Sequence, residues 1–103
     1  MYKSDIKILE FVEILKDQKI IRFDSGFYTP IGMAKSIFNN IKHQDKYPDR
    51  QSWHFTAEHI RLICEVFNAN SNFFFGLSDQ PFRNKKNNGN MNGNIKLNKI
   101  LNN

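Results

Sequence analysis

The residues best suited to chemistry in this chain are two adjacent amides, Asn39 and Asn40, in the stretch IGMAKSIFNNIK at residues 31–42. A side-chain amide presents a hydrogen-bond donor and an acceptor in one plane, and adenine exposes the matching pair at its major-groove edge. The plain alternative is that both amides only solvate an exposed helix, because the chain contains 14 asparagines. The choice between these two interpretations depends on the structural elements that position the amides.

The pattern around the amides predicts a helix over residues 34–43. Gly32 supplies the permissive backbone of a tight turn before it, and Met33 follows as an apolar plug. At about 100° per residue the helix has two distinct faces. The buried face carries Ala34, Ile37, Phe38 and Ile41, and the outward face carries Ser36, Asn39, Asn40 and His43, with Lys35 and Lys42 at its edge.

Four further helices are predicted around it. The first runs from a cap at Ser4 to about Gln18, with Asp5 in the first turn, where the helix dipole favours an anion. Asp24 or Ser25 caps the second helix, which is irregular or ends early, because proline at position 30 cannot continue it. The buried face of the first helix has the spacing i, i+3, i+4, i+7 and consists of Ile8, Phe11, Val12 and Leu15.

The fourth and fifth helices follow a long loop from residue 44. Thr56 caps the fourth, with Glu58 in its first turn. Asn70 or Ser71 caps a brief fifth helix, and Gly76 ends it. The apolar positions of the fourth helix are Ile60, Ile63, Cys64 and Phe67, and residues 19–23 are interpreted as a connection.

Charge and composition divide the chain into a domain at 1–83 and an asparagine- and lysine-rich flexible tail at 84–103. The formal net charge is +5. The domain holds 11 Lys or Arg against all 10 acids, whereas the tail holds four lysines, no acid and nine asparagines. Between residues 25 and 44 there is no acid at all, so the field there suits phosphate.

Several classes of protein are excluded by what the sequence lacks. Cys64 is the only cysteine, so there is neither an internal disulfide nor a cysteine zinc site. The spacing of His43, His54 and His59 does not match that of metal ligands, so no metal site is expected. The sequence also contains no motif for a catalytic nucleophile and no phosphate-binding loop, so neither an enzyme nor a cofactor is expected. No apolar run reaches the roughly 18 residues of a membrane span, so a cytoplasmic protein without a membrane anchor is expected.

These residues resemble the small five-helix DNA-binding domain of phage repressors, Cro-like proteins and xenobiotic-response-element type regulators. The resemblance covers about residues 5–80 and includes HFTAEHIRLICEVFNANSNFFFGLSD as the fourth and fifth helices, with the ending Gly76, Leu77, Ser78, Asp79. Position 28, usually small in that family, is a tyrosine here, which implies a wider helix crossing or an outward-turned ring. The turn and core of the helix-turn-helix would be Phe27, Ile31, Gly32, Met33, Phe38 and Ile41.

The resemblance implies an all-α, repressor-like helix-turn-helix protein that binds double-stranded DNA and regulates transcription in the cytoplasm of a bacterium or as a phage product, at the nucleoid. Helix 34–43 would enter the major groove. Asn39 and Asn40 would read bases, with Ser36 reaching a base or a phosphate and Ile37 touching a thymine methyl. The phosphate contacts would come from Lys35, Lys42 and His43.

A homodimer is also expected from the resemblance, through the fifth helix. Three adjacent phenylalanines cannot all face one side of a short helix, so one or two should pack in the core. The remaining ring, with Leu77 and Phe82, either forms a dimer patch or packs only within the protein. The dimer contact would use Phe74, Phe75 and Leu77. Trp53 would either clamp the DNA backbone together with Lys46 and Arg50 or close the core.

Two other functions fit the same fold. One is an antitoxin-type module, whose helical body or tail neutralises a protein partner; the segment IKLNKIL in the tail has a weak helical spacing that could order on such a partner. The other is a non-specific nucleoid-type DNA binder, in which the asparagines would be idle. The lysine-rich tail is then either an electrostatic arm or a passive terminus.

Overall fold

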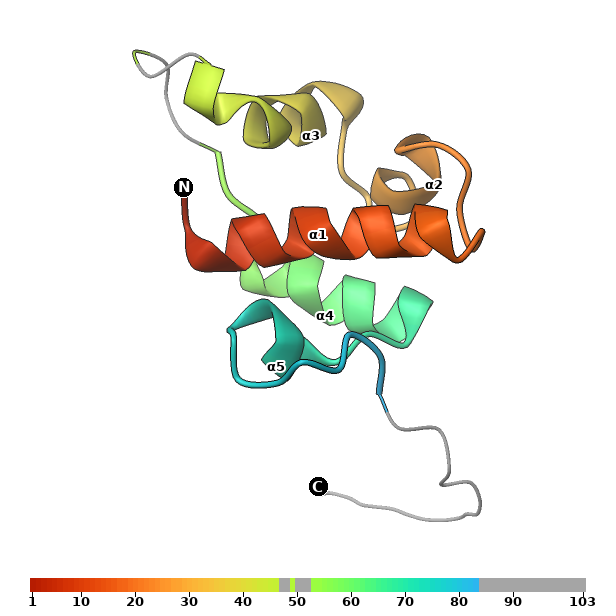
Figure 1. Ribbon diagram of the computed structural model, residues 1–103. Helices are drawn as coiled ribbons and strands as arrows, with labels where there is room; N and C mark the ends of the chain where they lie inside the picture. The colour runs from red at the N-terminus through yellow and green to blue at the C-terminus, as the bar shows by residue number, and fades with distance from the viewer. Residues whose placement is uncertain (47–48, 50–52, 84–103) are drawn as a thin grey trace.

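Five α-helices and one 3₁₀ helix make up the regular structure of the described residues (Figure 1). The computed structural model describes residues 1–46, 49 and 53–83, and the predicted tail at 84–103 lies outside them. For the described part, the all-helical prediction is confirmed. The elements are α1 (Lys3–Asp17), α2 (Ser25–Tyr28), α3 (Lys35–Lys42), η1 (Gln44–Lys46), α4 (Ala57–Phe67) and α5 (Ser71–Phe74).

Helix α1 runs across the middle of the molecule, with α2 and α3 on one side of it and α4 and α5 on the other (Figure 1). Its buried stripe is the predicted one, because Ile8, Phe11, Val12 and Leu15 are each exposed by 1% or less. A stripe with this spacing lets a helix bury one side along its whole length. Helix α1 therefore provides the surface on which the other helices pack.

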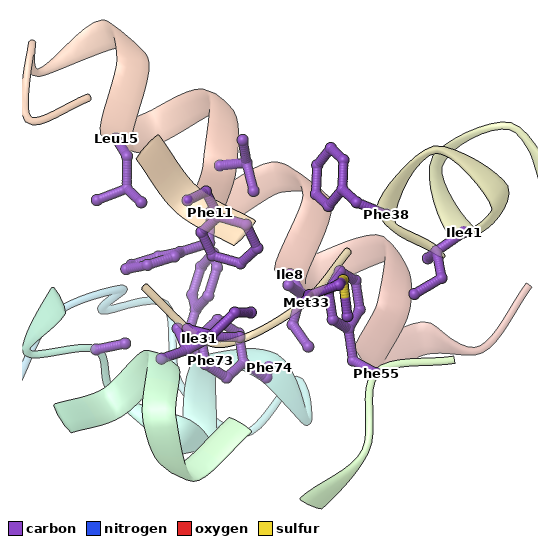
Figure 2. Packing of buried hydrophobic residues seen from close by; sticks show 14 residues of the cluster. Ile8, Phe11, Leu15, Ile31, Met33, Phe38, Ile41, Phe55, Phe73 and Phe74 are labelled. Carbon is purple, nitrogen blue, oxygen red and sulfur yellow. The ribbon is translucent and has the colours of Figure 1, made fainter. Parts of the chain in front are cut away.

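An aromatic cluster joins α2, α3 and α4 to one another. The ring centroid of Phe27 lies 5.8 Å from that of Phe38, 6.2 Å from that of Phe55 and 5.7 Å from that of Phe67. Ring pairs at such separations contribute roughly 0.5–1.5 kcal/mol each beyond the burial of their surface. Figure 2 shows Phe38 and Ile41 pointing from α3 toward the body of the protein.

The start of α1 differs from the prediction. The helix begins at Lys3, and Tyr2 occupies the position before it without a side-chain capping bond, so Ser4 lies inside the first turn and the predicted Ser4 cap is wrong. The reason is tertiary: the Tyr2 ring stacks on His54, with centroids 3.7 Å apart and planes inclined by 5°. This contact fixes the chain direction before Ser4 is reached.

Asp5 is fully buried, although the sequence indicated only a dipole-stabilised residue in the first turn. Its Oδ1 accepts a hydrogen bond from the backbone N–H of Phe55 at 3.0 Å, and its Oδ2 lies 2.7 Å from Nδ1 of His54. A buried carboxylate is tolerated only when it has such partners. Asp5 therefore fastens the N-terminal turn of α1 to the segment that leads into α4.

Helix α2 is a single turn that ends at Tyr28, two residues before Pro30, so the prediction of an early end is confirmed. The large side chain of Tyr28 allowed either a wider crossing of the two helices or a ring turned outward, and the structure shows which of the two occurs. The tyrosine is half-buried, and its ring centroid lies 5.4 Å from that of Phe38. The ring therefore lies against α3 instead of turning outward.

The caps of α4 and α5 agree with the sequence. Thr56 accepts a hydrogen bond from the backbone N–H of His59, and the His59 ring accepts one from the backbone N–H of Thr56, which completes a reciprocal cap that was not anticipated. Asn70 caps α5 by accepting a bond from the backbone N–H of Asn72 at 3.1 Å. On α4 only Ile63 is fully buried, and the other three predicted core positions are half-buried.

After α5 the chain turns at Gly76 (φ +74°) and folds back beside the end of α4. The N–H of Asn70 donates to the carbonyl of Pro81, and the N–H of Arg83 donates to the carbonyl of Asn68, both at 2.9 Å. Phe82 then packs on Phe11, 5.3 Å between centroids. Nothing in the local sequence predicted this return, because its partners are backbone groups.

None of the helices in the described residues combines the length and the apolar character needed to cross a membrane.

Replacing Asp5 with alanine should lower the free energy of unfolding by about 3 kcal/mol, because it leaves a buried backbone N–H and His54 without their acceptor. Urea unfolding followed by circular dichroism measures the change. The control is Glu10→Ala, which removes an exposed ion pair with Lys7 at 3.4 Å and should cost less than about 1 kcal/mol. Equal losses for the two variants would contradict the role assigned to Asp5.

Candidate nucleic-acid interface

The turn before α3 is closed by two backbone hydrogen bonds. The N–H of Gly32 donates to the carbonyl of Thr29 at 3.0 Å, and the N–H of Met33 donates to the carbonyl of Tyr28 at 2.9 Å. Gly32 has φ +72°, a conformation that favours glycine. The apolar residues predicted to form the turn and core of the motif are all buried, namely Phe27, Ile31, Met33, Phe38 and Ile41.

Helix α3 has the two faces that its sequence predicts. Phe38 and Ile41 are fully buried, and Ile37 is half-buried and packs against the core. On the other side Lys35 and Ser36 are exposed, while Asn39, Asn40 and His43 are half-buried. Ala34, predicted as the first residue of the buried face, precedes the helix and is exposed. The structure thus brings the predicted polar residues together on one face.

The two amides on this face make no hydrogen bond to any residue that the structure describes. In the described residues, the side-chain hydrogen bonds around the end of α3 are made by Lys42 and Gln44, and the side chains of Asn39 and Asn40 make none. A half-buried amide without a protein partner must bond to water or to another molecule. No described residue therefore occupies the donors and acceptors of these two side chains.

Lys42 lies in a different environment from the one expected of a free phosphate contact. Its Nζ is 2.9 Å from Oδ2 of Asp24, and the lysine side chain is 35% exposed. Oδ1 of the same carboxylate is shielded from solvent and lies 2.6 Å from Nζ of Lys16, in the last turn of α1. Asp24 therefore bridges two lysines that belong to two different helices.

The electrostatics of this bridge follow from its geometry. Partial burial by itself would raise the pKa of Asp24, but the ion pairs with Lys16 and Lys42 outweigh it, and the pKa lies below its ordinary value. The partnership with Asp24 also raises the pKa of Lys16, against a smaller opposing effect of burial. Because the folded-state pKa of Asp24 is depressed, the bridge stabilises the fold at neutral pH, and that contribution is lost as the pH falls through the depressed value.

The predicted dimer contact on α5 needs a correction. Phe74 is fully buried and packs edge-on against Phe11, with centroids 5.4 Å apart, so it is not available to a partner. Phe73 is buried as well, and the ammonium of Lys7 lies over its ring. The single turn of α5 presses these two rings onto α1, whereas Phe75 is 52% exposed and Leu77 is 76% exposed.

Two of the histidines make contacts within the fold. His54 binds Asp5, and His59 belongs to the cap of α4. Burial raises the pKa of the Cys64 thiol, which lowers its reactivity. Over the part of the chain that the structure describes, no group of three His, Cys, Asp or Glu side chains is placed to hold a metal ion.

Trp53 does not close the core, because its side chain is 38% exposed. Its carbonyl accepts a hydrogen bond from Nε2 of Gln44 at 3.3 Å, which ties the end of the long loop to the end of α3. Of the two cations considered with it, Lys46 is exposed and Arg50 lies outside the described residues.

The most informative residue that the sequence did not reveal is Asp24. It was considered only as a cap for α2, and although it occupies that position it makes no side-chain capping bond. Its partners lie eight positions before it and 18 positions after it, and no local spacing rule connects such residues. Only the tertiary structure, in which α3 contacts α2, brings the three side chains together.

Comparisons of the chain with protein-family models, with curated proteins and with solved structures gave no match. The functional interpretation therefore depends on the chemistry of α3 and of the residues around it.

Gly32→Ala should lower the free energy of unfolding by about 1–2 kcal/mol, the cost of a left-handed backbone for an L-residue. A Cβ at this position would meet no atom within 4 Å, so the loss would come from the backbone alone. Gly32→Asn should cost less, because asparagine tolerates this conformation better. Thermal and urea unfolding measure both variants, and equal losses for alanine and asparagine would argue against a backbone cause.

Proposed function

We propose that this protein binds double-stranded DNA sequence-specifically and regulates transcription by occupying an operator, with α3 as the recognition helix of a repressor-like helix-turn-helix. The observation that carries the proposal is the contrast between the two faces of α3. Phe38 and Ile41 are fully buried and Ile37 is half-buried, whereas the amides have no partner among the described residues. A surface of this kind is what a helix needs in order to read base edges.

The dimensions of α3 suit a DNA groove. An α-helix with its side chains is about 10–12 Å across, and the major groove is about 12 Å wide, so a helix such as α3 can enter it. Asn39 and Asn40 would pair with adenine, where a good bidentate contact contributes roughly 1–3 kcal/mol of discrimination. Ser36 would reach a base or a phosphate, and the accessible part of Ile37 would contact a thymine methyl.

The charge around α3 supports an approach to DNA. No aspartate or glutamate occurs between residues 25 and 44, so no carboxylate from this segment repels a phosphate. Lys35 is exposed at the start of α3 and His43 is half-buried at its end, and both would contact the backbone of the duplex. Such contacts set the position of the helix without reading sequence.

A homodimer would suit a regulator of this size. Phe75 and Leu77 are exposed beside a groove of about 520 Å³, whose lining includes Ala57, Ile60 and Cys64 together with Phe75 itself. We assign the dimer contact to Phe75 and Leu77, with Leu77 of each protomer seated against the groove of the other. A two-fold dimer would place its recognition helices on the two halves of a symmetric operator.

Asn39→Ala should weaken binding to the preferred site by roughly 1–3 kcal/mol and leave affinity for random DNA almost unchanged, because it removes base contacts only. The preferred site comes from selection out of a random duplex library, and anisotropy titrations give the dissociation constants. Lys35→Ala is the comparison, since the loss of a phosphate contact should weaken binding to both DNAs alike. If both variants lose affinity equally on both DNAs, Asn39 does not read bases.

Leu77→Asp should shift the protein toward monomer and reduce affinity for a two-fold symmetric site more than for a half-site, because it places a charge in the proposed contact. Sedimentation velocity measures the oligomeric state. Phe23→Asp serves as the control, since Phe23 is 66% exposed in the connection before α2, outside the proposed contact. A wild-type monomer on a site without symmetry would contradict the dimer.

A further inference from the structure

Asp24 holds together three segments that are distant in the sequence. Its carboxylate lies at the start of α2, and its two oxygens face Lys16 from the last turn of α1 and Lys42 from the last turn of α3, at 2.6 and 2.9 Å. All three side chains are partly shielded, with exposures of 25% for the aspartate, 26% for Lys16 and 35% for Lys42. Partial shielding strengthens such pairs relative to fully exposed ones.

The arrangement amounts to an anion site that is already occupied. Two ammonium groups converge on the two oxygens of one carboxylate, and a phosphate group can offer two oxygens to the same pair of donors. Lys42 belongs to the predicted interface of α3, so the site adjoins the surface that we assign to DNA. For Lys42 to bind a backbone phosphate, it must first leave Asp24.

We propose that Lys16 and Lys42 form a phosphate-binding site in which Asp24 acts as a built-in counter-ion, so that a backbone phosphate of DNA must displace the carboxylate to bind there. The inference rests on the proposed function for the identity of the phosphate, but the site itself does not depend on it. The displacement is an exchange of ion pairs, and no bond is made or broken.

This device affects specific and non-specific binding differently. Binding of a phosphate breaks the two ion pairs that Asp24 makes with Lys16 and Lys42. A phosphate that is not aligned with both lysines forms weaker ion pairs than the ones that are lost. When base contacts hold the duplex in register, the phosphate can be aligned with both lysines. Asp24 therefore weakens binding to random DNA, which consists almost entirely of phosphate contacts.

The same bridge positions α3. It links the last turn of the helix to the end of α1, at a point beyond the buried contacts of Phe38 and Ile41. Asp24 is thus a positioning residue as well as a counter-ion, and a test must separate the two roles. A purely structural residue would change stability without changing the salt dependence of binding.

The experiment compares three full-length variants with the wild-type protein. Asp24→Asn removes the counter-ion, and Asp24→Glu keeps a carboxylate. Asp17→Asn makes the same change in charge at an exposed residue that forms no ion pair among the described residues. Circular dichroism first establishes that each variant is folded.

The first measurement is the affinity for random duplex DNA at several salt concentrations. Asp24→Asn should bind random duplex several-fold more tightly than wild type at low salt. The slope of log K against log salt should be steeper by about 0.9 for one additional neutralised phosphate. Asp24→Glu should restore the wild-type slope, and Asp17→Asn should leave it unchanged. Identical slopes for Asp24→Asn and Asp17→Asn would contradict the proposal that Asp24 acts as a counter-ion to the two lysines.

The second measurement uses inorganic phosphate and no DNA. In a titration followed by NMR, the side-chain signals of Lys16 and Lys42 should shift together in Asp24→Asn and much less in wild type. No shift in Asp24→Asn would overturn the anion site. If phosphate shifts both lysines but neither wild type nor variant binds duplex DNA, the anion site stands and the proposed DNA-binding function fails.

Discussion

The burial of Phe38 and Ile41 is the constraint on which the candidate interface depends. Helix α3 has eight residues and α2 has four, and isolated helices of such lengths are not stable in water. Their structure must come from packing, which the cluster of Phe27, Phe38 and Phe55 supplies. Since these rings fix the rotation of α3 about its own axis, they also decide that Asn39 and Asn40 face away from the core.

Two aspartates complement this apolar packing, each in a different way. Asp5 is fully buried and bonds to a histidine and a backbone N–H in the segment that leads into α4, so it joins two parts of the fold inside the protein. Asp24 lies near the surface and shares its charge between two lysines. Removal of the first would leave buried polar groups without partners, whereas removal of the second would release two cations. These two aspartates therefore hold separate elements of the fold together in addition to balancing its charge.

On one face of α3, the amide side chains have no hydrogen-bond partner in the part of the chain that the structure describes. Several polar side chains make structural hydrogen bonds. They include the cap of α4, the bond from Asn70 to the return segment at 78–83, and the buried carboxylate of Asp5. The amides of α3 stand apart from these networks, in a segment without acids. A helix face that carries planar donors and acceptors without partners among the described residues suits the recognition of a ligand, which is the physical basis of the proposed function.

The sequence by itself determined the features that depend on neighbours along the chain. The buried stripe of α1, the early end of α2 before Pro30, the glycine turn at Gly32 and the caps at Thr56 and Asn70 all follow from spacing and local backbone preference. The two faces of α3 follow in the same way, because helical periodicity is a local property. These features were sufficient to identify the candidate surface.

Only the tertiary structure decided which polar groups meet across long separations. It placed Asp5 with His54, turned Asp24 to Lys16 and Lys42, and buried Phe74 while leaving Phe75 exposed. Each outcome depends on the angle at which one helix rests on another, and residues 18 or 49 positions apart carry no local signal of that angle. Packing therefore decided that the charge of Lys42 on α3 is paired with Asp24. The order of the residues along the helix decided which of them share its buried and its polar face.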